Sequence, residues 1–140
     1  MKYWDASALV PLAIAEQQSA KVRGWLDADA TIVTWGWTRV ELASAIERRA
    51  RLREISRAQR RAALDRFEEL ANYWDEVVDL IAVRSRALAL LARHPLRATD
   101  AAQLGAALLV AGDDPATLTF VCLDDRLALA AEREGMRILT

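Results

Sequence analysis

Short apolar runs alternate with longer helical patterns along this chain, and that alternation limits the possible folds more than any other feature. The run Leu118–Leu123 is the clearest strand, because it is short, apolar and rich in β-forming residues. Similar short runs predict strands at Lys2–Trp4, Thr31–Thr34, Val77–Leu80 and Met136–Leu139. Strands that alternate with helices favour a parallel sheet covered on both faces. We therefore predict an α/β fold, a three-layer α/β/α arrangement around a central parallel sheet.

Helical patterns fill the segments between the predicted strands. Ser7 and Thr99 are candidate N-caps, and Gly112 and Gly135 are placed to end helices. No linker or internal repeat interrupts the pattern, so we expect a single domain over residues 1–140. The predicted helices are Ser7–Ala15, Gln17–Asp29, Thr38–Arg53, one beginning at Ser56, Ala82–Arg93, Asp100–Val110 and Arg126–Glu134.

Four acidic residues stand where these elements meet. Asp5 and Asp124 follow predicted strands, and Glu41 and Asp100 lie in the first turns of predicted helices. Ligands of parallel sheets bind beyond the carboxyl ends of the strands, so we expect these side chains to converge. At about 5 Å and an effective dielectric of about 20, each carboxylate pair costs about 3 kcal/mol. A hard cation such as Mg²⁺ or Mn²⁺ would offset that cost, which points to metal-dependent phosphodiester chemistry.

Each of these acids also has an ordinary structural explanation. Asp100 can accept hydrogen bonds from backbone N–H groups at the start of its helix. Asp124 or its neighbour Asp125 can cap the helix that follows, and Glu41 can form a surface pair with Arg39. The joint placement of the acids, rather than any one of them, therefore favours a site.

The charge distribution is more informative than the net charge of −1. All of the 19 basic residues except Lys2 and Lys21 are arginines, and many of them fall between Arg48 and Arg66. Arginine binds phosphate in a bidentate manner, so this segment is either a phosphate-binding surface or a solvated helix face with ion pairs. Of Arg48 and Arg49, Arg48 is the better candidate for substrate contact, because it lies seven residues after Glu41 on the same helix face.

The sequence shows no sign of membrane insertion or of secretion. No apolar run approaches the roughly 20 residues that a membrane span needs, and the first residues lack a signal-peptide pattern. We expect a cytoplasmic protein without a membrane partner. The lone cysteine, Cys122, lies in a predicted strand and is expected to be a buried thiol.

Four segments resemble, in order and in spacing, the motifs of the PIN-domain family, and within that family the toxins of the VapC type. The resemblance covers essentially the whole chain. It departs from the family at Cys122, where Thr or Ser is common. The four segments are Asp5–Val10, Val40–Ile46, Leu96–Leu104 and Phe120–Ala131.

This resemblance implies a Mg²⁺- or Mn²⁺-dependent endoribonuclease that acts as the toxin of a toxin–antitoxin pair. Asp5, Glu41, Asp100 and Asp124 would be its metal ligands and catalytic residues, and a metal-activated water would attack the phosphorus. RNA is then the implied substrate and a cognate antitoxin the implied partner. The alternative is a non-catalytic PIN-like domain that binds RNA or protein.

Three further residues, Ser7, Arg39 and Arg48, are candidates for contact with the substrate. Ser7 would either support a metal-bound water or cap its helix. Arg39 would either bind a phosphate or neutralise Glu41 before the metal binds. Apolar residues of the first two helices are expected to be partly exposed in a lone subunit and covered by the antitoxin or by a second copy in a homodimer. They are Leu9, Val10, Leu12, Ile14, Val22, Trp25 and Leu26.

Overall fold

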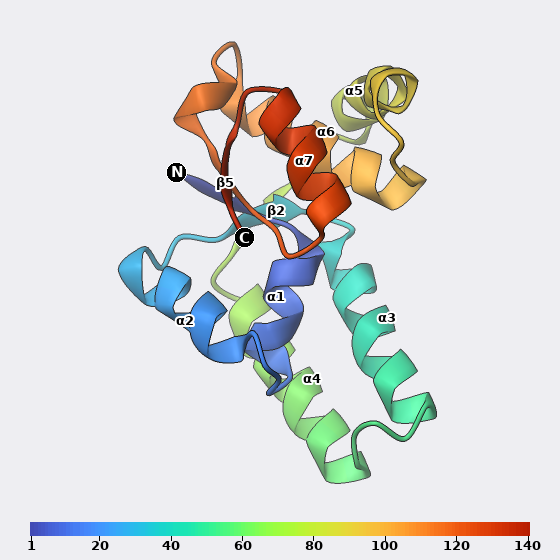
Figure 1. Cartoon of the computed structure of the whole chain (residues 1–140). Helices are drawn as coiled ribbons and strands as arrows, with labels where there is room; N and C mark the ends of the chain where they lie inside the picture. Colours follow the sequence, from blue (N-terminus) through green and yellow to red (C-terminus); the bar gives the residue numbers. More distant parts are fainter.

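A five-stranded parallel sheet forms the centre of the computed structural model, which describes all 140 residues (Figure 1). The strand order is β3-β2-β1-β4-β5, and every neighbouring pair is parallel. This confirms the predicted α/β/α fold. The strands are β1 (Lys2–Trp4), β2 (Val33–Trp35), β3 (Asp75–Val77), β4 (Thr119–Val121) and β5 (Arg137–Leu139).

Seven α-helices connect and cover the strands. They are α1 (Ala6–Ala13), α2 (Ser19–Ala28), α3 (Thr38–Arg51), α4 (Arg57–Ala71), α5 (Leu80–Arg93), α6 (Ala98–Ala111) and α7 (Asp125–Arg133), and a short 3₁₀ helix η1 (Pro115–Thr117) precedes β4. None of these helices is both long enough and apolar enough to cross a membrane.

The two layers of helices follow from the alternation of side chains along the central strands. Tyr3 and Phe120 point to one face, where they pack with α5, α6 and α7. Trp4 and Val121 point to the other face, where they pack with α1 to α4. Figure 1 shows these two groups of helices on opposite sides of the sheet. Both faces are therefore covered, as the nearly continuous apolar strands require.

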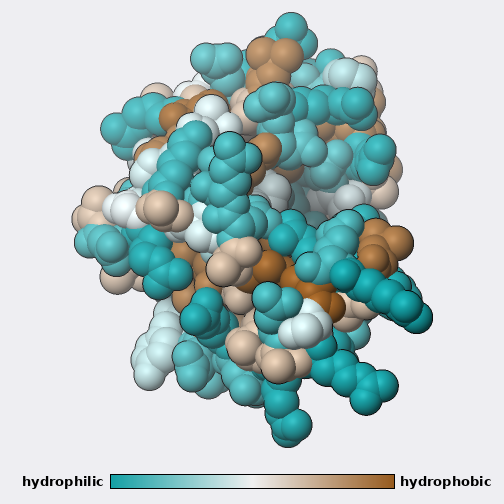
Figure 2. Space-filling model, turned by 60° about the horizontal axis from the view of Figure 1, so that its bottom comes forward, coloured by the Kyte–Doolittle hydropathy of each residue, from teal (hydrophilic) through white to brown (hydrophobic).

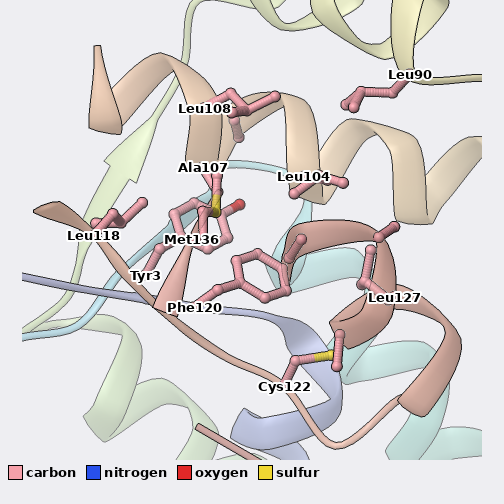
Figure 3. Close-up of a cluster of buried hydrophobic side chains, with 14 of the residues drawn as sticks. Tyr3, Leu90, Leu104, Ala107, Leu108, Leu118, Phe120, Cys122, Leu127 and Met136 are labelled. Atoms are coloured by element: carbon pink, nitrogen blue, oxygen red, sulfur yellow. The ribbon is translucent and has the colours of Figure 1, made fainter. Parts of the chain in front are cut away.

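The core beneath α6 contains the largest buried cluster (Figure 3). The rings of Tyr3 and Phe120 stack there with their centroids 5.6 Å apart. Small residues on α6 let α5 approach closely, because a Cβ at Gly105 would lie 3.1 Å from the carbonyl oxygen of Val83. Gly112, with a φ of 65°, ends α6 in the backbone region that favours glycine.

The chain changes direction across the sheet at β1. From β1 it proceeds outward through β2 to β3, and it then returns to build β4 and β5 on the other side of β1. This reversal is the switch point at which parallel sheets leave a crevice beyond the carboxyl ends of the strands. The residues that directly follow β1 and β4 are therefore expected to border this crevice.

The ends of three predicted elements need correction. Asp5, not Ser7, is the N-cap of α1, and α6 begins at Ala98 rather than after a Thr99 cap. The expected strand Val77–Leu80 is displaced toward the N-terminus, because Asp79 caps α5 by accepting from the backbone N–H of Ala82. In each case a capping contact sets a helix start that the apolar pattern alone does not define.

Candidate active site

Asp5 lies at the carboxyl end of the central strand and is the most buried of the four acids, with 4% of its surface exposed. Its backbone N–H bonds the carbonyl of Val121, which continues the pairing of β1 with β4 by one residue. Its carboxylate Oδ2 accepts from the backbone N–H and from the hydroxyl of Ser7. Burial raises the pKa of Asp5 above its usual value; the Ser7 hydrogen bonds lower it, and the charge of Asp100 raises it further.

Glu41 reaches the crevice from the first turn of α3. Its Oε1 accepts a hydrogen bond of 2.9 Å from the side-chain amide of Gln103 on α6. Burial raises the pKa of Glu41 to about 7; the hydrogen bond from Gln103 opposes this shift, while the charges of Asp5 and Asp100 add to it. Glu41 therefore lies in an environment with excess negative charge.

Asp100 and Asp124 stand at the starts of two helices, and each uses one carboxylate oxygen there. Asp100 Oδ2 accepts from the backbone N–H of Arg97 at 3.3 Å, and Asp124 Oδ1 accepts from that of Leu127 at 3.0 Å. Burial raises the pKa of Asp100, and the negative charge of Asp124 raises it further. Asp100 is half-buried and Asp124 exposed, so the acids form a gradient from the buried Asp5 to the surface.

The electrostatic coupling of these four acids suits a hard divalent cation. Their donors are carboxylate oxygens, which Mg²⁺ and Mn²⁺ prefer. A bound cation would offset the burial and the mutual repulsion that raise the pKa values of Asp5, Glu41 and Asp100. In this structure no three acidic, His or Cys side chains lie close enough together to hold one ion. Three of the carboxylates, those of Asp5, Asp100 and Asp124, accept a backbone N–H at a helix start, and each keeps one oxygen outside that bond.

Ser7 and Cys122 connect the acids beneath the crevice. The Ser7 hydroxyl donates to Asp5 and accepts from the backbone N–H of Leu123 at 3.0 Å, so it ties β4 to the start of α1. The Cys122 sulfur accepts from the backbone N–H of Asp124 at 3.3 Å. Cys122 is buried, as expected, and burial raises the pKa of its thiol (Figure 3). Its sulfur thus occupies the position where a hydroxyl would be expected, and it orients Asp124.

The expected pairing of Arg39 with Glu41 is wrong. Arg39 turns away from the crevice, pairs with Glu76, and donates to the carbonyl oxygen of Ala71 at 3.0 Å. Its guanidinium also lies over the ring of Trp74, 5.3 Å from the centroid. The guanidinium of Arg39 is therefore bound by Trp74 and Glu76 and not by Glu41.

The Arg48–Arg66 segment is divided between ion pairs and exposed side chains. Arg49 pairs with Glu16, and Arg60 pairs with Glu47 at 2.7 Å. Arg48 is exposed on α3 and has no ion-pair partner. In Figure 2 the far ends of α3 and α4 come forward, and the surface there is mostly hydrophilic. The solvated-face explanation therefore holds for part of the segment.

The expected exposure of some apolar residues on α1 and α2 holds only in part, because Val10, Trp25 and Leu26 are partly buried and the other four are buried. Leu9, Leu12, Ile14 and Val22 are buried, because α1 and α2 pack under the sheet and against α3 and α4. The largest exposed apolar side chains lie elsewhere, chiefly before and on α3 and along α5. Those near α3 and α5 are Trp37, Val40, Val78, Leu80, Ile81, Leu88 and Leu91, with exposed fractions between 41% and 74%, and Tyr73, after α4, is 88% exposed.

Two arginines that the sequence did not single out flank the acids. A cleft of about 420 Å³ opens beside the starts of α6 and α7. Arg97 and Arg126 are exposed at this cleft, and their positive charges lower the pKa of Asp100. Both lie within the motifs that contain Asp100 and Asp124, which is the signal that could have identified them. The cleft is lined by Arg97, Thr99, Asp100, Leu123, Asp124, Asp125 and Arg126.

The parallel sheet and the acids at its switch point define a class of α/β domain with an acidic crevice, and comparison with known proteins identifies the family. The family model described as PIN domain matches residues 2–133. The chain therefore belongs to the PIN domain family. PIN domains are generally nucleases, and PIN-domain nucleases typically use divalent metal ions.

A solved structure supports the fold assignment. The crystal structure of PAE2754 from Pyrobaculum aerophilum is similar to this chain, with a TM-score of 0.64 and 23% sequence identity. The similarity covers 98% of this chain and 87% of that one. At this identity the likeness concerns the fold alone. The search of curated proteins gives no match.

Proposed function

We propose that this PIN domain is a Mg²⁺- or Mn²⁺-dependent endoribonuclease and that it acts as the toxin of a toxin–antitoxin pair. The observation that carries the catalytic part is the electrostatic coupling among Asp5, Glu41, Asp100 and Asp124 at the switch point of the sheet. Four mutually repelling carboxylates are costly to a fold, and a cation offsets that cost. Resemblance of the four motifs to the VapC type supports the toxin part.

Different residues of the chain would bind the metal ion and the RNA substrate. Asp5, Glu41, Asp100 and Asp124 would hold the ion, which when bound supplies an activated water and offsets the charge on the phosphoryl oxygens. Ser7 holds the Asp5 carboxylate in place, and the Cys122 sulfur does the same for the Asp124 backbone. The crevice thus supplies ligands, while exposed arginines beside it supply cations for the RNA backbone.

Removal of the metal is expected to stop cleavage. The purified protein should cut end-labelled structured RNAs in the presence of Mn²⁺, and excess EDTA should abolish the products, because the acids alone supply no activated water. Addition of Mn²⁺ beyond the EDTA should restore them. Undiminished cleavage in EDTA would refute the metal-dependent mechanism. A protein that binds these RNAs but never cuts them would instead be the non-catalytic domain.

Arg97 and Arg126 are expected to carry more of the RNA affinity than Arg48. Both lie at the cleft that contains Asp100 and Asp124, whereas Arg48 lies farther along α3. Replacing both with Ala should reduce the slope of log affinity against log salt by about 1.4, since each single-strand phosphate contact contributes about 0.7. Binding should be measured in an Asp5→Asn background, so that cleavage does not interfere.

Two single variants serve as comparisons for this prediction. Arg61→Ala removes an exposed arginine from α4 and should leave the salt slope unchanged. Arg48→Ala tests the α3 path without breaking the ion pair that Arg49 makes with Glu16. A slope that falls with Arg48→Ala and not with the Arg97 and Arg126 replacements would place the RNA along α3 instead of at the cleft.

A cognate antitoxin would hold the toxin inactive, and the subunit would pair with a second copy. The apolar side chains exposed on α5, among them Ile81, Leu88 and Leu91, support the expectation of a protein partner. Induced expression alone should arrest growth, and co-expression of the neighbouring small reading frame should restore it. Unimpaired growth at high expression of an active nuclease would count against the toxin role.

A further inference from the structure

We propose that Gln103 is a positioning residue that holds the Glu41 carboxylate at the crevice, through an amide group whose orientation is fixed from below by Tyr3. This inference rests on the proposed metal-dependent function and adds a residue to it. Gln103 is fully buried on α6. It follows Asp100 by three residues, which places both on the same side of the helix. One turn of α6 thus presents a carboxylate at the crevice and an amide beneath it.

The hydrogen bonds determine which way the Gln103 amide faces. The Tyr3 hydroxyl donates to Gln103 Oε1 at 2.7 Å, and Gln103 Nε2 donates to Glu41 Oε1 at 2.9 Å and to Thr38 Oγ1 at 2.8 Å. An ionised Glu41 has no proton to donate, so the opposite orientation would bring two acceptors together. Both amide protons are therefore committed, one of them to Glu41.

The directions of the remaining hydrogen bonds in the network follow from the single proton that each threonine hydroxyl carries. The single proton of Thr34 goes to the carbonyl oxygen of Trp4 at 2.7 Å, so Thr38 donates to Thr34 Oγ1 at 2.8 Å while it accepts from Gln103. No buried side-chain nitrogen or oxygen in the protein lacks a partner. The network is complete, and each of its hydrogen bonds has a defined direction.

The position of Gln103 indicates a role beyond packing. Its buried neighbours on α6 are Ala, Leu and Gly, and an apolar residue there would bury no amide group at all. The buried network of Tyr3, Thr34, Thr38 and Gln103 meets an acid of the crevice at one point only, the bond to Glu41. A carboxylate held in this way is oriented before any cation arrives, and such outer partners tune metal sites strongly.

The test compares Mn²⁺ binding by the parent protein and by Gln103→Met, measured by isothermal titration calorimetry without RNA. Met preserves the length and the burial of the side chain and removes both amide donors. Loss of an outer hydrogen-bond partner weakens metal affinity by about 10–100-fold, and we expect a decrease in that range. Tyr3→Phe, which frees the amide to rotate, should give a smaller decrease in the same direction.

A matched control separates positioning from loss of stability. Leu104→Val trims the buried neighbour of Gln103 on α6 and touches no polar group. It should lower the melting temperature while keeping the Mn²⁺ affinity of the parent. Parental affinity in a folded Gln103→Met variant would overturn the proposal, and so would an equal loss of affinity in Leu104→Val.

A measurement on the unaltered side chain covers the case in which Gln103→Met does not fold. In the parent protein the side-chain amide proton signals of Gln103 should shift in NMR spectra as Mg²⁺ is added, and Glu41→Gln should remove that shift. Bound Mg²⁺ without any shift at Gln103 would overturn this proposal and leave the proposed function standing. A parent protein that bound neither ion would overturn both.

Discussion

Asp5→Asn is expected to abolish most RNA cleavage and to leave the fold intact. Asp5 is the buried acid at the end of the central strand, and its carboxylate is the expected metal ligand that the substitution removes. Loss of one group that stabilises transition-state charge costs about 10²–10³-fold in rate, and we expect at least that loss in single-turnover assays. Asn caps a helix as well as Asp does, so α1 should keep its N-cap.

The same variant should melt at a higher temperature than the parent when no metal is present. Burial raises the pKa of Asp5, which means that its charged form is costly in the folded protein. A neutral amide removes that cost and the repulsion from Asp100. Ser7→Ala is the comparison, because it removes a hydrogen bond to Asp5 and retains the charge, and it should melt lower. Parental cleavage by Asp5→Asn would exclude Asp5 from the mechanism.

Mn²⁺ is expected to stabilise the protein much more at pH 8 than at pH 5.5. Burial raises the pKa of Glu41 to about 7, so at pH 5.5 this residue holds a proton that the metal must displace. A ligand at 100 times its dissociation constant stabilises by about 2.7 kcal/mol, which corresponds to a rise of roughly 5–15 °C in melting temperature. Differential scanning fluorimetry at the two pH values measures the difference.

Without metal the pH dependence should have the opposite sign. The pKa of Glu41 is 4.5 in its ordinary state and about 7 in the folded protein. The folded state therefore binds more protons in this range, and the stability present below pH 4.5 is lost as the pH rises through about 7. Glu134, whose pKa is lowered, titrates below this window. Glu41→Gln should make this slope smaller, and Asp5 and Asp100, whose pKa values are also raised, keep part of it. An equal metal effect at both pH values would contradict the assignment.

The fold and the placement of the four acids were accessible from the sequence because they depend on local patterns. Short apolar runs rich in β-forming residues identified all five strands, although β3 was displaced. Acids next to strand ends and helix starts identified the crevice, since a parallel sheet brings those ends together. Ser56 was also placed correctly, because a capping box with Gln59 marks the start of α4 in the sequence itself.

The features that were missed depend on contacts between distant segments. In the sequence Gln103 is a polar residue in a largely apolar helix, and only the structure shows its hydrogen bonds with Tyr3 and Glu41. Arg39 stands beside Glu41 in sequence, but its partner Glu76 belongs to β3. Side-chain partners across the sheet are set by tertiary packing, which no local pattern encodes.

The position of β1 in the middle of the sheet affects the order in which the protein folds during its synthesis. Tyr3 pairs with Val33 on one side and with Phe120 on the other. β1 is synthesised first and therefore lacks one of its two neighbouring strands until β4 is made. Closing such long loops is slow, and an isolated pair of strands is only marginally stable. Asp100 and Asp124 emerge after most of the chain, so a nascent polypeptide carries Asp5 and Glu41 without their counterparts. Translation order therefore delays assembly of the four acids until α6 and β4 have been made.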